Sequence, residues 1–105
     1  MTKLKEARTK VRDLAEVVRD DVFNDWIERY VVTAKRSDEW TRSSVLYEDY
    51  ASRAVGFGNN RTEKAIARET VASVTRWGKM MGSLFPAKER RRNGWYYPVR
   101  LKQLG

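Results

Sequence analysis

Apolar residues recur at helical spacing in the first part of the chain. A narrow stripe within residues 3–19 consists of Leu4, Ala7, Val11, Leu14 and Val18. A wider apolar face follows, with Val22, Phe23, Trp26, Ile27, Tyr30, Val31 and Ala34. The two patterns predict two helices, the second capped by Asp20 and Asp21, or one long bent helix that contains both patterns.

The narrow stripe is compatible with two arrangements. It packs on its own domain, or it forms a homodimer seam through Leu4, Val11, Leu14 and Val18. It covers only about two heptads, which is too short for an independent coiled coil. We therefore expect residues 1–20 to form an N-terminal helix that packs or dimerises, and residues 21–105 to form the main domain.

The middle of the chain has helical patterns separated by turn residues. Residues 40–42 predict a short strand, after which Ser43 or Ser44 caps a helix that carries Val45, Leu46, Tyr47, Tyr50, Ala51 and Ala54. Residues 56–60 end that helix, and Asn60 and Glu63 have the spacing of a capping box. The next pattern, Ile66, Thr70, Val74, Trp77 and Met81, predicts one helix to Ser83 or a break at which Thr70 caps a second helix.

The C-terminal segment alternates as a β-hairpin does. Residues 84–91 form the outgoing strand, Asn93 and Gly94 a type I′ turn, and residues 95–102 the returning strand. The apolar positions of the return are Trp95, Tyr97, Val99 and Leu101. We expect Trp95 and Tyr97 to lie in the core, whereas the pattern does not assign Tyr96.

Helices followed by a hairpin predict a mainly α fold with a C-terminal β-hairpin. The specific arrangement that we expect is a winged helix-turn-helix with an extra N-terminal helix. Its recognition helix would span about residues 70–82 and its wing residues 88–94. Gly78 inside the helix costs about 1 kcal/mol relative to Ala, which close approach of another backbone would explain.

Charge and composition narrow the function. The chain has 105 residues, with 22 Lys plus Arg, 14 Asp plus Glu and a net charge of +8. Residues 61–105 hold eleven basic and three acidic side chains, so eleven minus three accounts for the whole excess. Such an asymmetry favours a polyanionic partner.

Catalysis and membrane insertion are not expected. The chain has no Cys and no His, which removes thiolate metal sites and the commonest general base. Its carboxylate pairs are adjacent in sequence and point about 100° apart on a helix. We therefore expect no enzyme activity, metal, cofactor or small-molecule substrate. The sequence also has no apolar run of about 18 residues and no secretory signal.

Double-stranded DNA is the partner that the pattern favours. Short polar and cationic side chains on a helix can reach base edges in the major groove, and an Arg-rich hairpin can follow phosphates or enter the minor groove. The apolar side of the helix from Thr70 is expected to be Val71, Val74, Trp77 and Met81. The expected DNA-binding residues are Arg42, Ser44, Ser73, Thr75, Arg76, Lys79, Lys88, Arg90, Arg91, Arg92 and Asn93.

Three short motifs occur in these elements, at residues 43–50, 76–81 and 88–96. The first looks like an "S-x-L-Y-x-x-Y" helix, the second like an "F-G-x-x-L" recognition helix with Trp77 at the aromatic, and the third like a basic wing. Together they resemble the winged-helix domain at the C-terminus of phage, plasmid and poxvirus-type primase-helicases, over about residues 22–102. The chain lacks the motor's G-x-x-x-x-G-K-[ST] loop, and its first twenty residues have no counterpart.

The resemblance implies a DNA-binding protein of a phage or mobile element, either an excised domain or a stand-alone protein. It would act in replication initiation or transcription regulation, in the cytoplasm or nucleoid of a bacterial host. The alternative is a winged helix used as a protein-interaction adaptor or as an inhibitor of a nucleic-acid enzyme. RNA is less favoured, because the expected recognition helix suits the wide B-form groove.

Overall fold

The computed structural model describes residues 17–102. Of the expected dimer seam, Leu4, Val11 and Leu14 lie outside this part of the chain, and Val18 lies inside it. The first described element is a helix over residues 17–30. Asp20 and Asp21 are exposed inside this helix and do not begin it, so the expected cap is wrong. The domain division expected at residue 20 falls within this continuous helix.

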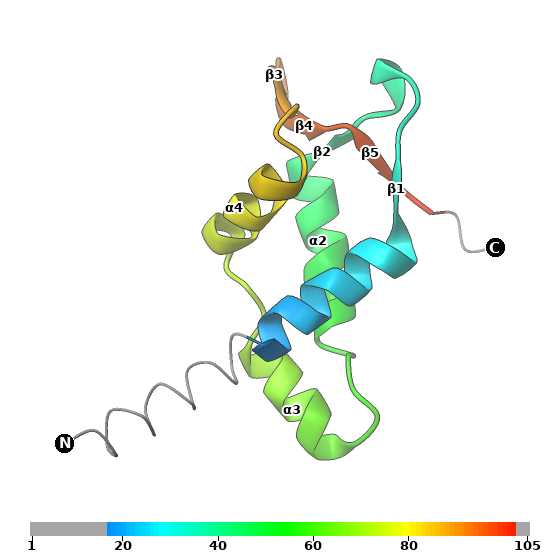
Figure 1. Ribbon diagram of the computed structural model, residues 1–105. Coiled ribbons are helices and arrows are strands. Elements are labelled where there is room, and N and C mark those ends of the chain that lie inside the picture. Colours follow the sequence, from blue (N-terminus) through cyan, green and yellow to red (C-terminus); the bar gives the residue numbers. More distant parts are fainter. Residues whose placement is uncertain (1–16, 103–105) are drawn as a thin grey trace.

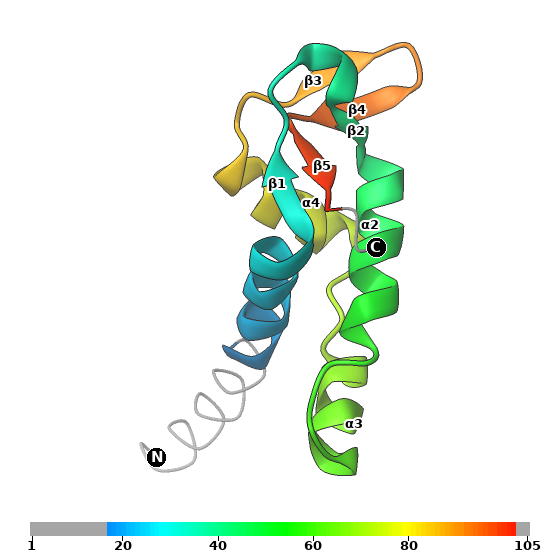
Figure 2. The same ribbon diagram turned by 90° about the vertical axis from the view of Figure 1, so that its right-hand side faces the viewer.

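A small sheet that the periodicity did not indicate follows this helix. The helix ends at residue 30, and β1 (Val31–Thr33) takes the place of the helical turn expected to reach Ala34. The run of β-branched side chains in β1 favours a strand. β1 pairs antiparallel with β5 (Val99–Leu101), and Figure 2 shows the two strands side by side.

The second sheet contains the C-terminal hairpin, which is confirmed. After the 3-10 turn η1 (Ser37–Glu39), β2 (Thr41–Arg42) pairs with β4 (Gly94–Tyr97), which pairs with β3 (Glu89–Arg91). The strand order is β2-β4-β3. The returning strand is interrupted at Pro98, because proline has no N–H to donate to a ladder.

The hairpin turn differs from the expected type I′ geometry. A type I′ turn needs positive φ at both central residues. Gly94 has φ +126°, but no residue other than glycine has positive φ in the described part of the chain. Arg91 pairs with Gly94, so Arg92 and Asn93 lie between the paired residues.

Three further helices carry the fold: α2 (Ser43–Ala54), α3 (Arg61–Glu69) and α4 (Val74–Leu84). The outgoing arm of the hairpin therefore does not begin at Leu84. Neither Ser43 nor Ser44 caps α2, whose N-cap is Arg42 without a side-chain cap. With four helices and two small antiparallel sheets, the described residues form a mixed α/β structure. None of the described helices has the length and apolar character needed to cross a membrane.

The turn before α3 is fixed by a partly confirmed capping box. Asn60 Oδ1 accepts from the Glu63 N–H at 2.9 Å, as the spacing predicted. The Glu63 carboxylate accepts from the backbone N–H of Asn59 at 2.6 Å, and not from that of Asn60. Gly58 is required here, because its φ is +115° and a Cβ would lie 2.8 Å from the Glu63 Cβ.

The break between α3 and α4 is confirmed, but its cap lies three residues later than expected. Thr70 ends α3, and its hydroxyl donates to the carbonyl oxygens of Ile66 and Ala67. Ser73 caps α4, with its Oγ accepting from the Arg76 N–H at 3.2 Å. The shift changes which residues α4 buries: Val74 is 61% exposed and does not belong to the core.

An aromatic core joins the helix over 17–30, α2, α4 and β4. Its largest fully buried side chains are Trp26, Trp77, Tyr50, Leu46, Met81 and Val99. The Trp77 ring lies 5.4 Å from the Tyr47 ring and 6.0 Å from the Tyr97 ring, both edge-on. The expectation for Tyr97 is confirmed. Figure 1 shows β3 and β4 at one end of the molecule and α3 at the other.

Candidate nucleic-acid interface

Two tyrosines of α2 hold the start of α4 in place. Tyr47 Oη donates to the Ala72 carbonyl at 2.8 Å, and the Ala72 N–H donates to Tyr50 Oη at 3.0 Å. Their three-residue spacing places both side chains on one side of α2. Burial raises the pKa of Tyr50, and the opposing hydrogen bond from Ala72 is a weaker influence. The pair therefore orients α4 through its first turn.

The outer face of α4 carries the side chains expected there. Ser73, Thr75, Arg76 and Lys79 are exposed and line a surface hollow together with Met80 and Ser83. The Ser73 hydroxyl is also the helix cap. Within residues 17–102, neither Arg76 nor Lys79 forms an ion pair. This face thus presents two cations whose charge no described carboxylate neutralises.

The three arginines of the hairpin have different surroundings. Arg90 and Arg92 are exposed and make no ion pair with any described residue. Arg91 is half-buried: its Nη2 donates to the Ser37 carbonyl at 2.9 Å, and its Nε lies 3.5 Å from Glu89. Its guanidinium also lies 5.1 Å from the Trp40 ring centroid and 4.8 Å from that of Tyr96. Arg91 therefore attaches the hairpin to η1.

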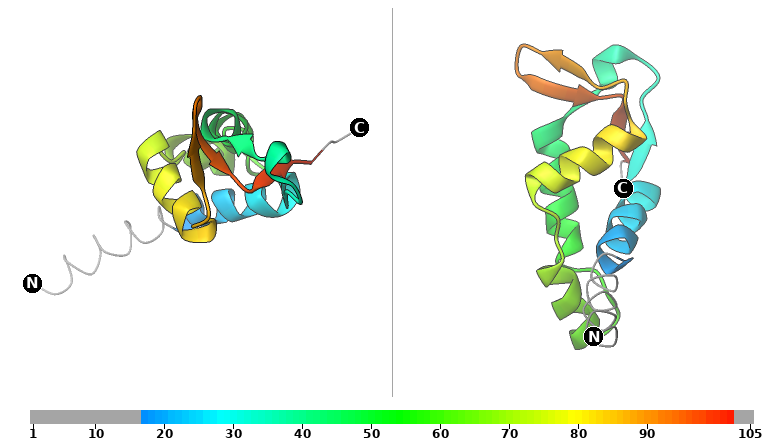
Figure 3. Two further views of the ribbon diagram at one scale, coloured as in Figure 1. Left: turned by 90° about the horizontal axis from the view of Figure 1, so that it is seen from above. Right: turned by 60° about the vertical axis from the view of Figure 1, so that its left-hand side comes forward.

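The remaining expected contacts lie around the hairpin. Arg42, on β2, is exposed and its Nε donates to the Ser44 hydroxyl at 2.9 Å. Arg42 pairs with Tyr96 of β4, so β2 flanks the hairpin. Asn93 is exposed in the turn. Figure 3 shows the hairpin projecting beyond the body of the molecule on the side of α4.

A cleft lies between α4 and the hairpin, and its key residue was misplaced by the sequence pattern. Trp95 was expected in the core, but it is 40% exposed. We call this space the α4–hairpin cleft; it measures about 330 Å³ and is lined by Ser43, Val74, Thr75, Trp77, Gly78, Lys79, Gly82, Lys88, Trp95 and Tyr97. Lys88 Nζ lies 4.9 Å from the centroid of the Trp95 ring. The buried Trp77 Nε1 has no hydrogen-bond partner among the described residues.

Glycines of α4 leave this cleft open. A Cβ on Gly78 would meet nothing within 4 Å, so the close backbone approach expected there is wrong. A Cβ on Gly82 would have the Lys88 Nζ as its nearest neighbour, at 3.8 Å. The two glycines are four residues apart and therefore lie on one side of α4.

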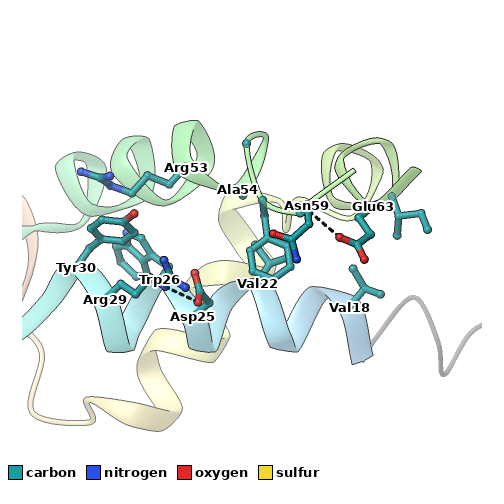
Figure 4. A pocket seen from close by; sticks show the side chains of 14 residues that line it. Val18, Val22, Asp25, Trp26, Arg29, Tyr30, Arg53, Ala54, Asn59 and Glu63 are labelled. Atoms are coloured by element: carbon teal, nitrogen blue, oxygen red, sulfur yellow. Dashed lines mark hydrogen bonds and ion pairs between the residues drawn. The ribbon is translucent and has the colours of Figure 1, made fainter. Parts of the chain in front are cut away.

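A larger hollow lies between the helix over 17–30, α2 and α3, and we call it the helix groove (Figure 4). It measures about 580 Å³, and Val18, Val22 and Trp26 contribute to its wall. Its charged side chains have partners within the described residues. The list of these interactions is Asp25 with Arg29 at 2.8 Å, Arg53 with Asp49 at 2.9 Å, and Glu63 with the Asn59 N–H at 2.6 Å.

Arg53 shows how the charges of the helix groove are held. Its guanidinium carbon lies 3.6 Å from the centroid of the Tyr30 ring. The hydrogen bond to Asp49 raises the pKa of Arg53 above its already high ordinary value. The Asp49 carboxylate also accepts from Trp26 Nε1 at 2.8 Å. The polar groups of this groove therefore connect its own helices.

No family model matches the chain, and comparison with curated proteins and with solved structures gives no match. The resemblance to primase-helicase winged-helix domains therefore stays a prediction. Within residues 17–102, no three His, Cys, Asp or Glu side chains are grouped so that they could hold a metal ion.

Proposed function

We propose that the protein binds double-stranded DNA as a winged helix, with α4 in the major groove and the β3–β4 hairpin on the backbone or in the minor groove. The observation that carries the proposal is the position of the exposed cations. Arg76 and Lys79 on α4, and Arg90 and Arg92 on the hairpin, have no carboxylate partner in the described chain. Phosphates can neutralise such a cluster, with release of counterions.

The shapes of the two elements support the same assignment. An α-helix with its side chains is about 10–12 Å wide, and the B-DNA major groove is about 12 Å wide. The strand order β2-β4-β3 places a projecting hairpin directly after the helix that would enter the groove. Residues near the start of a recognition helix contact base edges. Thr75 and Arg76 occupy that position in α4.

The tyrosine contacts with Ala72 support a fixed recognition helix. A helix that reads base edges must keep its orientation relative to the wing, and α2 fixes the turn from which α4 begins. Together with the motif resemblance, this favours a DNA-binding protein of a phage or mobile element. Its role would be replication initiation or transcription regulation in a bacterial host's cytoplasm or nucleoid.

The decisive experiment compares two double variants that remove the same charge. Arg90→Ala with Arg92→Ala removes the two unpaired wing arginines and retains Arg91, which the fold uses. Arg29→Ala with Arg61→Ala is the control, because Arg29 borders the helix groove and Arg61 begins α3 at the opposite end of the molecule. The measurement is fluorescence anisotropy of a labelled duplex at several salt concentrations.

The wing variant should bind every duplex sequence more weakly and have a salt slope shallower by about two units, roughly 0.9 for each lost phosphate contact. The control should retain most of the wild-type slope. Equal losses in both variants would mean that net charge alone drives binding. If wild type has no duplex affinity at low salt, the protein-adaptor function replaces this one.

A further inference from the structure

We propose that the α4–hairpin cleft binds one unpaired nucleotide, with its base stacked on Trp95 and its phosphate held by Lys79 and Lys88. The proposal rests on the proposed DNA binding and specifies its substrate. DNA with a single-stranded segment beside the duplex, such as a fork, should bind better than a plain duplex.

The exposure of Trp95 is the first observation. Trp26 and Trp77 are 2% and 1% exposed, whereas Trp95 is 40% exposed. Trp95 and the buried Tyr97 are two residues apart on β4, so both project from the same face of the strand. Because both residues line the cleft, the exposure of Trp95 follows from the space beside it and not from an outward orientation.

The shape of the cleft is the second observation. Gly78 and Gly82 give α4 no side chains on the wall that borders this space. The resulting volume of about 330 Å³ is at the lower end of the usual range for small-ligand pockets, and no duplex could enter it. A single base and its sugar are ligands of suitable size and shape.

The charge of the cleft is the third observation. Lys79 comes from α4 and Lys88 from the segment before β3, and neither has a carboxylate partner in the described chain. Lys88 Nζ now lies near the Trp95 ring. Its flexible stem allows the ammonium to move to a phosphate while a base takes its place on the indole. Aromatic rings beside cations bind single strands because every base has a π-face.

A duplex backbone is the competing occupant. Its phosphates would contact the two lysines, but its paired bases could not reach the indole face. The two occupants therefore differ in whether Trp95 senses a base directly. Trp emission measures this, because stacking of a base quenches the indole.

The first test is a titration of Trp emission with a single-stranded thymidine oligonucleotide. Wild type should be quenched, and the Trp95→Phe variant should lose that part of the quenching. Trp40 is the other partly exposed indole, and the variant separates its signal from that of Trp95. Quenching that is absent from wild type, or unchanged in Trp95→Phe, would overturn the proposal.

The second test compares anisotropy of a forked and a fully paired oligonucleotide. Trp95→Leu should weaken fork binding by about five- to 150-fold, the equivalent of one lost base–aromatic stack, and leave duplex binding near wild type. Trp95→Phe should keep most of the fork preference. Leu84→Ala is the matched control, because Leu84 is 49% exposed at the end of α4 and does not line the cleft.

The outcomes separate the two proposals. Wild type that binds duplex but shows no preference for the fork would overturn the cleft proposal and leave duplex binding standing. Equal loss of fork and duplex binding in Trp95→Leu, with an unchanged melting temperature, would also overturn it. Wild type that binds neither oligonucleotide at low salt would contradict the proposed function itself.

Discussion

The two hollows of the molecule differ in how their charges are satisfied. The helix groove is the larger, at about 580 Å³ against about 330 Å³ for the α4–hairpin cleft. Asp25, Arg53 and Glu63 in the groove each interact with another group of the protein. Lys79 and Lys88 in the cleft have no such carboxylate partner among the described residues. Unneutralised charge, and not size, therefore distinguishes the candidate binding site.

This difference predicts opposite consequences of mutation. Side chains of the helix groove should contribute mainly to the free energy of unfolding. Side chains of the cleft should contribute mainly to binding. Each variant below is expected to affect one of these quantities more than the other.

The largest effect on stability should come from Trp26→Ala in the wall of the helix groove. Trp26 is 2% exposed, and truncating a buried Trp costs about 3–5 kcal/mol. The change also removes the hydrogen bond from Nε1 to Asp49. Urea denaturation should report this loss, whereas Trp95→Leu should barely change the midpoint. A stability loss in Trp95→Leu as large as that in Trp26→Ala would remove the distinction.

A smaller effect is expected where α2 contacts the turn before α4. Tyr50→Phe leaves the buried Ala72 N–H without its acceptor, which costs about 1–3 kcal/mol. Tyr47→Phe should cost less, because the Ala72 carbonyl that it frees lies in a partly buried contact. Denaturation of both single variants would establish the order. A greater loss for Tyr47→Phe would contradict it.

The smallest effect should be a gain. Gly78→Ala adds a Cβ that meets nothing, and replacing a helical Gly stabilises a protein by about 0.5–1 kcal/mol. The same methyl group narrows the cleft, so fork binding should decrease while duplex binding persists. Gly58→Ala is the contrasting variant and should destabilise, because Gly58 has positive φ and little space. Thermal melting and anisotropy on the same samples would test both statements.

Local patterns predicted much of the fold. Helix α2, the hairpin, the break before α4 and the burial of Trp77 follow from apolar periodicity and turn residues within short windows. The β1–β5 sheet could not be predicted in this way, because periodicity carries no information on which distant strands pair. β1 was assigned to the preceding helix because Val31 also continues the helical apolar spacing.

The candidate site was predicted in residue type more than in arrangement. The exposure of Arg76 and Lys79 on the outer face of α4 is confirmed, but the phase of that helix depended on where the break fell, and Val74 was misplaced for this reason. Alternation alone placed Trp95 with Tyr97, because it cannot show that glycines on another element leave a space. The capture of Arg91 by Ser37 and Trp40 depends on contacts that no local pattern contains.

The β1–β5 pairing has a consequence for the order of folding. It joins a strand that follows the first described helix to the last described strand, and beside it Lys102 Nζ donates to the Glu28 carbonyl across 74 residues of chain. Closing so long a loop costs conformational entropy before any contact repays it. The hairpin and the helices can form from local contacts, whereas this sheet must wait until residues 99–101 have been synthesised. We therefore expect β5 to join last in folding.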